Sequence, residues 1–206
     1  MENKLDSYKV ILASASPRRT ELLGQIGIAH EIIVSDCEEK ITSEVPQDVV
    51  MELSTQKAED VYNKYKISHS VENFLVIGSD TIVAIDGMIL GKPKDEKDAF
   101  QMISRLQGNI HQVYTGVTIL WNKNGEKKQN TFYECSNVDV YPMCEKEILD
   151  YIKTGEPMDK AGSYGIQGRF AAHIKGIHGD YNNIVGLPVG RIYQEMKSEL
   201  GGKTDV

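Results

Sequence analysis

Segments with the pattern of a β-strand alternate with segments with the pattern of an α-helix, and this alternation constrains the fold more than any other feature. The first pair is a short apolar run over residues 10–13 and a helical pattern that begins near residue 17. Ser16 is a favourable N-cap residue and Pro17 suits the first helical position. The alternation and the hairpin signals along the chain together predict a mixed α/β sheet instead of an all-parallel one.

The remaining elements follow from the same patterns. Asp86-Gly87 is a strong hairpin signal between two apolar runs. The sequence predicts strands over residues 30–35, 74–85, 88–90, 112–121 and 130–141. It predicts helices over residues 46–65, 95–106, 144–154 and 189–200, and a turn-rich stretch over 156–188. No internal repeat or obvious linker divides the chain.

Composition limits the functional classes. A chain of 206 residues with 40% hydrophobic and 26% charged residues fits one large domain or two small lobes of a soluble protein. The net charge of −7 argues against nucleic acid as a partner. No apolar run approaches the ~18 residues of a membrane-spanning helix, and the start lacks the apolar core of a signal peptide. Three cysteines without Cys-x-x-Cys spacing predict reduced thiols in the cytoplasm.

Two arginines follow the predicted start of the first helix. The first turn of a helix presents unpaired N–H groups and the positive end of the helix dipole, which together favour anions and especially phosphate. Arg18 and Arg19 add forked hydrogen-bond donors there. Their positive charges interact unfavourably with the positive end of the helix dipole, and a bound polyphosphate would offset that cost. A solvated pair of arginines at a helix start is the alternative interpretation.

Charged side chains also interrupt two apolar patterns. Asp80 lies in an apolar strand, where a carboxylate is costly unless it is hydrogen-bonded, paired or close to a metal. Its functional roles would be general base or metal ligand, and its structural role would be to cap a turn. Lys57 shares a helical face with Val50, Leu53 and Val61, so it either extends to solvent or meets a buried anion.

Two loops add further candidates. Lys92 follows the predicted hairpin, whose geometry would return it to the neighbourhood of Asp80. Residues 159–168 hold three glycines, which allow close backbone approach to a ligand, and Gln167, whose amide can read the edge of a base. A plain flexible loop is the alternative for this segment. The chain contains neither a Walker A motif nor a dinucleotide-binding fingerprint.

Taken together, these motifs resemble the Maf family of nucleoside triphosphate pyrophosphatases, in the order in which that family carries them. The matching segments are Ser14-Ala15-Ser16-Pro17-Arg18-Arg19, Glu38-Glu39, Lys57-Ala58, Gly78-Ser79-Asp80-Thr81-Ile82-Val83, Lys92-Pro93, residues 159–168 and residues 179–188. The form Tyr164-Gly165-Ile166-Gln167-Gly168 resembles the branch that takes dTTP and UTP. One departure, Arg169-Phe170-Ala171-Ala172, stands where many members carry more glycines.

The resemblance implies a fold and an activity. The fold would be one domain over residues 1–206, an elongated mixed sheet flanked by helices, with two lobes and a cleft as in inosine triphosphate pyrophosphatases. The activity would be cleavage of the α–β bond of a nucleoside triphosphate with Mg²⁺, Mn²⁺ or Co²⁺. The alternatives are another base preference, such as 7-methyl-GTP, and a nucleotide-sensing regulator linked to cell-division arrest. The oligomeric state stays open, a homodimer included.

The resemblance also implies roles for individual residues. Asp80 would accept the proton, and Glu39 and Asp80 would bind the metal. Arg18, Thr81 and Gln167 would occupy the specificity positions. The remaining matches to the site are Ser14, Arg19, Glu39, Lys57 and Lys92. We expect the arginines and lysines among them, with the first helix N-terminus, to hold the phosphates of the substrate.

Overall fold

A computed structural model describes residues 7–68, 73–123 and 125–200, and these residues form two compact units. Unit 1 comprises residues 1–80, 116–133 and 186–206, and unit 2 comprises residues 81–115 and 134–185. Three long strands, β3 (Phe74–Ile85), β5 (Ile110–Lys123) and β6 (Glu126–Val140), contribute residues to both units.

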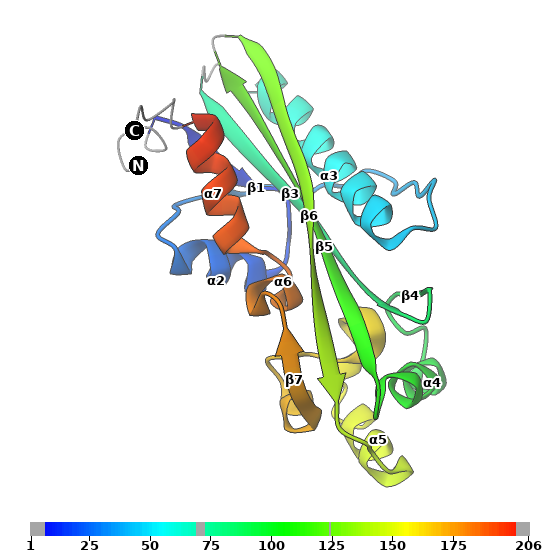
Figure 1. Cartoon of the computed structure of the whole chain (residues 1–206). Coiled ribbons are helices and arrows are strands. Elements are labelled where there is room, and N and C mark those ends of the chain that lie inside the picture. Colours follow the sequence, from blue (N-terminus) through cyan, green and yellow to red (C-terminus); the bar gives the residue numbers. More distant parts are fainter. Residues whose placement is uncertain (1–6, 69–72, 124, 201–206) are drawn as a thin grey trace. The chain divides into compact units, whose positions relative to one another are not determined.

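The described strands form a seven-stranded sheet, drawn in Figure 1, in the order β2-β1-β3-β5-β6-β7, with β4 paired to β3. The shorter strands are β1 (Lys9–Leu12), β2 (Glu31–Ile32), β4 (Met88–Leu90) and β7 (Ile174–His178). β1 runs parallel to both β2 and β3, whereas the β3–β4 and β6–β7 pairs are antiparallel. The predicted mixed α/β sheet is therefore confirmed.

In unit 1, helix α3 (Pro46–Ser68) packs on one face of the sheet, on the opposite side from α2 and α7 (Figure 1). A buried cluster joins the two layers, and it includes Tyr62 of α3 and Phe74 of β3, whose ring centroids lie 4.9 Å apart. Gly78 allows an especially close approach, because a Cβ there would lie 2.3 Å from the Ser54 carbonyl oxygen of α3. Helix α3 is thus seated against β3 where that strand reaches Asp80.

Helices α2 (Pro17–Gln25) and α7 (Val189–Leu200) also belong to unit 1. Leu22 and Leu23 of α2 are buried, as the apolar pattern predicts. Helix α7 is anchored on β6 by a hydrogen bond of 2.8 Å from Asn130 to Glu195 and by Arg191, whose guanidinium lies over the Phe132 ring. The predicted bounds of α7 are confirmed.

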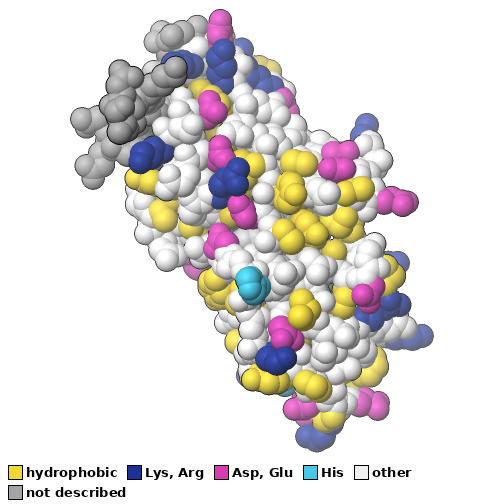
Figure 2. Space-filling view, in the orientation of Figure 1, with side chains coloured by type: hydrophobic (Ala, Val, Ile, Leu, Met, Phe, Trp, Pro, Cys, Tyr) yellow, Lys and Arg dark blue, Asp and Glu magenta, His cyan; other side chains and the backbone are white. Residues whose placement is uncertain are grey.

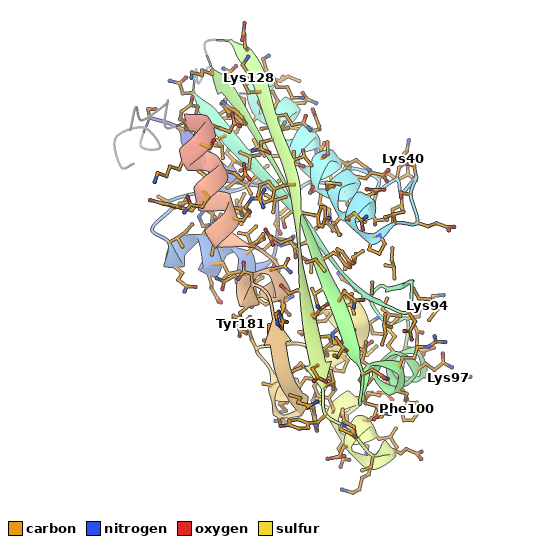
Figure 3. All side chains as sticks on the ribbon, in the orientation of Figure 1. Lys40, Lys94, Lys97, Phe100, Lys128 and Tyr181 are labelled. Carbon is orange, nitrogen blue, oxygen red and sulfur yellow. The ribbon has the colours of Figure 1, made fainter. Side chains whose placement is uncertain are left out.

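Unit 2 carries the hairpin and the helices after it. Asp86 and Gly87 both have positive φ, of 50° and 76°, which is the backbone of a tight hairpin turn between β3 and β4. Helix α4 (Glu96–Leu106) begins after Asp95, which caps it by accepting from the Asp98 N–H at 2.8 Å. Figure 3 shows Lys97 and Phe100 on α4 and Lys94 just before it. The capping explains why the predicted helix and the observed one nearly coincide.

The rest of unit 2 departs from the sequence prediction. The turn-rich stretch 156–188 contains regular elements that the sequence did not indicate, a strand and several short helices. In addition to β7 these are η1 (Glu156–Asp159), η2 (Ala161–Ser163), η3 (Arg169–His173) and α6 (Tyr181–Val185), and α5 (Glu145–Ile152) precedes them.

In unit 1, only Glu31–Ile32 of the strand predicted over 30–35 is a strand. Short elements of this kind depend on partners distant in the sequence, which local periodicity does not report.

The surface carries both signs of charge. Figure 2 shows acidic and basic side chains interspersed over the visible face. Among the described residues, no helix is both long enough and apolar enough to cross a bilayer.

Candidate functional site

Strand β3 presents Asp80 to helix α3. Residues 78 and 80 point to the same face of the strand, because side chains alternate between the two faces. Gly78 brings α3 close to that face, and Lys57 of α3 places its Nζ 2.5 Å from Asp80 Oδ1. The Asp80 side chain is 15% exposed and that of Lys57 is 19% exposed. Of the two interpretations of Lys57, the structure therefore shows the meeting with a buried anion.

The same ammonium holds a second carboxylate. Lys57 Nζ lies 2.9 Å from Glu39 Oε1, and the Glu39 side chain is 49% exposed. Glu39 belongs to a segment between β2 and α3 that has no regular secondary structure. One lysine thus joins a largely buried aspartate of a strand and a half-exposed glutamate of a loop.

These two carboxylates fit the chemistry of a divalent cation that also binds phosphate. Mg²⁺ is usually bound through one or two carboxylates, with the substrate phosphates and water completing its coordination. Glu39 and Asp80 converge on one point, the Lys57 ammonium, so a small cation could share them. Within the described residues, no group of three or more His, Cys, Asp or Glu side chains could hold a metal ion. A cation at Glu39 and Asp80 would therefore need further ligands from the substrate phosphates or from water.

The corner between β1 and α2 offers hydrogen-bond donors. Ser16 occupies the N-cap position as predicted, but its side chain does not cap the helix, and no acidic residue lies in the first turn. The Ser14 hydroxyl oxygen accepts from the Ser16 N–H at 3.2 Å and from Arg19 at 3.1 Å. Because both lone pairs of that oxygen are engaged, its own proton is available to donate to a ligand.

Arg19 is bound to the protein itself. Its Nε donates to the Gly186 carbonyl oxygen at 2.8 Å, and Nη1 donates to the Ser79 carbonyl oxygen at 2.9 Å. Burial lowers the pKa of the Arg19 guanidinium, and the nearby Asp80 carboxylate opposes that shift. Arg19 therefore ties the β1–α2 corner to the strand segment that carries Asp80. A direct contact of Arg19 with phosphate stays a prediction.

Arg18 differs from its neighbour. It is partly exposed, and among residues 7–68, 73–123 and 125–200 it has no hydrogen-bond or ion-pair partner. Its positive charge adds to the factors that lower the pKa of Arg19. Arg18 is thus the arginine of this pair whose guanidinium the described protein groups leave available.

Unit 2 contains three of the predicted site residues, Thr81, Lys92 and Gln167. Lys92 is exposed, and the Gly91 carbonyl oxygen beside it accepts from the Gly162 N–H at 3.0 Å. Gly162 has a φ of 67°, and a Cβ there would lie 2.9 Å from the Val83 side chain. The glycine thus lets the loop that leads to Gln167 pack on the β3–β4 hairpin, next to Lys92.

Thr81 lies in a chain of hydroxyl groups. The Thr115 hydroxyl donates to the Asn183 carbonyl oxygen at 2.8 Å, and Thr115 Oγ1 lies 2.9 Å from Thr81 Oγ1. Thr115 has a single hydroxyl proton, so Thr81 is the donor between the two threonines. This arrangement directs the hydroxyl proton of Thr81 to Thr115.

Hydrogen bonds of two tyrosines, Tyr164 and Tyr151, hold the loop that carries Gln167. The Tyr164 hydroxyl lies 2.7 Å from His111 Nε2, and both residues are buried. The Tyr151 hydroxyl donates to Glu156 at 2.9 Å and accepts from the Gly165 N–H at 3.2 Å. Gln167 itself is exposed and has no hydrogen-bond partner in the described part of the chain. A fixed loop with a free amide at its tip is suited to reading a ligand.

Of the predicted site residues, unit 1 brings together Ser14, Arg19, Glu39, Lys57 and Asp80, with Arg18 adjacent in the sequence. The Ser79 and Gly186 carbonyl groups that bind Arg19 are not among the residues that the sequence predicts for the site. Gly186 lies in the segment 179–188, whose match to the family pattern was the available signal.

Comparison with known proteins agrees with these features. The family model described as Maf-like protein matches residues 9–199. Proteins named dTTP/UTP pyrophosphatase are 56% identical over 197 residues in Agathobacter rectalis and 52% identical over 191 residues in Lachnoclostridium phytofermentans. Each alignment covers 92% of this chain; the first covers 96% of the Agathobacter rectalis protein and the second covers 94% of the Lachnoclostridium phytofermentans protein.

Among solved structures, the dITP/XTP pyrophosphatase of Mycobacterium abscessus is 13% identical and covers 64% of this chain and 74% of its own. The TM-score of that match is 0.32. The chain belongs to the Maf-like protein family.

Proposed function

We propose that this protein is a nucleoside triphosphate pyrophosphatase that hydrolyses dTTP and UTP to the monophosphate and pyrophosphate. The observation that carries the proposal is the Lys57 ammonium that joins the Asp80 and Glu39 carboxylates. The names of the relatives from Agathobacter rectalis and Lachnoclostridium phytofermentans support the substrate class.

In this proposal, Asp80 is the general base. Water adds across the α–β anhydride: its oxygen bonds to phosphorus, the bridging P–O bond breaks, and pyrophosphate leaves. The proton of the water passes to the Asp80 carboxylate, a role that contributes about 10²–10⁴-fold in rate. Lys57 holds the Asp80 carboxylate in place through the ion pair of 2.5 Å.

Within unit 1, the phosphates would be held by groups of the β1–α2 corner. Ser14 supplies a hydroxyl donor, Arg18 a guanidinium, and the first turn of α2 its N–H groups. Arg19 contributes by holding the Ser79 carbonyl group next to Asp80 and adds positive charge. Such positioning is the main demand of phosphoanhydride hydrolysis.

Glu39 and Asp80 would hold a divalent cation, Mg²⁺, Mn²⁺ or Co²⁺. When bound, the cation would neutralise negative charge on the substrate phosphates. The fit of two converging carboxylates to such a cation supports this assignment.

Gln167 and Thr81 would select the base. An amide can donate to a carbonyl and accept from the ring N3–H that thymine and uracil share. Cytosine lacks that proton, so it would leave a partner unpaired. Thr81, whose hydroxyl proton is directed to Thr115, would be the second group that selects the base.

The cysteines bear on the compartment. Cys37, Cys135 and Cys144 are free thiols, which supports a reducing compartment such as the cytoplasm.

Initial rates of pyrophosphate release from a panel of triphosphates test the proposal. The panel holds dTTP, UTP, CTP, GTP and 7-methyl-GTP, each with Mg²⁺ and with Mn²⁺. We expect dTTP and UTP to be turned over fastest. A higher rate with 7-methyl-GTP would overturn the base preference, and tight binding of nucleotides without turnover would point to a sensor.

A further inference from the structure

An irregular segment of unit 1, residues 35–43, is attached to helix α3 by a ladder of side chains. The helix supplies Glu52, Gln56 and Asp60, which follow one another at four-residue spacing and therefore lie on one face. Figure 3 shows Lys40 on this segment, beside α3. The segment carries Glu39, so the ladder bears on the candidate site.

Gln56 makes the central contact of the ladder. Its Oε1 accepts from the Lys40 N–H at 2.8 Å, and its Nε2 donates to the Lys40 carbonyl oxygen at 2.6 Å. The side-chain amide thus pairs with both polar groups of the residue after Glu39. A pair of this kind fixes the position and the orientation of the backbone there.

The two flanking contacts fix the ends of the segment. Glu52 accepts from the Thr42 N–H at 2.9 Å and from the Thr42 hydroxyl at 2.5 Å. Asp60 accepts from the Ser35 hydroxyl at 2.8 Å and from the Asp36 N–H at 3.2 Å. Along the sequence Glu39 lies between these contacts, and the contact nearest to it is the one that Gln56 makes with Lys40.

We propose that Gln56 is a positioning residue that directs the Glu39 carboxylate to Lys57 and Asp80. The inference rests on the proposed function only for its catalytic consequence. Gln56 bonds to the backbone of Lys40 and not to Asp80. The effect passes through the backbone to Glu39, whose Oε1 lies 2.9 Å from Lys57 Nζ.

The exposure of Glu39 explains why a clamp is needed. An exposed ion pair contributes little by itself, because solvent screens it and two flexible side chains must be ordered. The Glu39 side chain is 49% exposed, so its pairing with Lys57 cannot hold an irregular segment in place. The bidentate pairing with Gln56 removes the backbone freedom in advance.

Metal titration of nucleotide hydrolysis tests the catalytic consequence. For Gln56→Ala, we expect the Mn²⁺ concentration for half-maximal rate to rise about 10-fold or more, the range for groups that orient a metal ligand. The rate at saturating Mn²⁺ should recover to within about 3-fold of the wild type, since Glu39 is retained. The matched control is Gln47→Ala, in the first turn of α3 and roughly 14 Å along the helix axis from Gln56.

The double variant Glu39→Ala/Gln56→Ala shows whether Gln56 acts through Glu39. The proposal expects Gln56→Ala to change the Mn²⁺ requirement by less than about 2-fold once Glu39 is absent, because coupled residues are not additive. Equal effects of Gln56→Ala in both backgrounds would overturn the proposal. So would a loss of rate that is the same at every Mn²⁺ concentration.

Hydrogen–deuterium exchange without nucleotide or metal separates this proposal from the proposed function. Gln56→Ala should speed exchange over residues 36–43 and leave β3 protected, whereas Gln47→Ala should not change that segment. Unchanged exchange over residues 36–43 would overturn the clamp even if the enzyme is a pyrophosphatase. Faster exchange together with no triphosphate turnover in the wild type would uphold the clamp and reject the proposed function.

Discussion

Lys57 Nζ lies 2.5 Å from Asp80 Oδ1, and this ion pair joins the longest helix of unit 1 to the middle of a buried strand. Gly78 makes the pair possible, since any Cβ there would collide with the Ser54 carbonyl group of α3. The carboxylate is thereby held next to α3 with only 15% of its side chain exposed. A general base must be held within hydrogen-bond reach of the proton that it accepts, and this ion pair fixes the position of the Asp80 carboxylate.

The first prediction concerns Asp80. Asp80→Asn keeps the shape of the side chain and removes its charge, so we expect dTTP turnover to fall at least ~100-fold. Circular dichroism should show the fold retained. The control is Asp86→Asn in the β3–β4 turn, where φ is positive and asparagine is well tolerated. Turnover of Asp80→Asn close to that of the wild type would make Asp80 a structural residue.

Part of this arrangement could be predicted from the sequence, and part could not. The bounds of β3, β4 and α7 agree with the apolar patterns, and the mixed sheet follows from the order of the elements. Helical periodicity predicts the face of α3 on which Lys57 lies, but it does not identify Asp80 as the partner of that lysine. The pattern of a segment reports which side faces the core and does not report what lies there.

The contacts that complete the site join residues far apart in the sequence. Arg19 donates to the carbonyl groups of Ser79 and Gly186, which follow it by 60 and by 167 positions in the sequence. Gln56 pairs with the backbone of Lys40. Backbone carbonyl groups carry no sequence signal, because every residue has one. Local patterns therefore identified Arg19 as a cation near an anion site and missed its attachment to Ser79 and Gly186.

The second prediction concerns pH. Burial lowers the pKa of His111 to about 4, against about 6.5 in the unfolded chain. The fold accommodates the neutral imidazole of His111. The contribution of His111 to the free energy of unfolding is therefore fully present above pH ~6.5, and it is lost as the pH falls toward 4. The loss should reach about 3 kcal/mol in the free energy of unfolding.

Urea unfolding between pH 4 and 7.5 measures this dependence. His111→Gln cannot titrate, so its stability should vary less over this range than that of the wild type. His178→Gln, at an exposed position of β7, should keep the wild-type dependence. Parallel pH curves for the wild type and His111→Gln would show that His111 is not the titrating group.

The third prediction concerns the hydroxyl chain of unit 2. Thr115→Val leaves Thr81 without the acceptor that fixes its proton. We expect the ratio of kcat/KM for dTTP over CTP to fall about 2- to 10-fold, the effect of one hydrogen bond. Thr118→Val removes another buried hydroxyl, bonded to Ser54, and should leave that ratio unchanged. An equal change in both variants would assign the effect to general loosening of the fold.

The fourth prediction concerns Gln167. Its exposed amide should read the N3–H of thymine and uracil, so Gln167→Ala should slow dTTP and UTP more than CTP. The preference for dTTP and UTP over CTP should narrow by about 5- to 150-fold, the effect of lost pairing in a closed site. Gln129→Ala on β6 is the control, and kcat/KM for the three nucleotides is the measurement. Equal slowing of all three would give Gln167 a role in the loop and none in base choice.

The bond that is cleaved tests the central claim most directly. Chromatography of the products of dTTP turnover by the wild-type protein, with Mg²⁺ or Mn²⁺, identifies that bond. We expect dTMP and pyrophosphate in equal amounts, with their formation almost abolished in Asp80→Asn. Formation of dTDP and orthophosphate as the main products would contradict it.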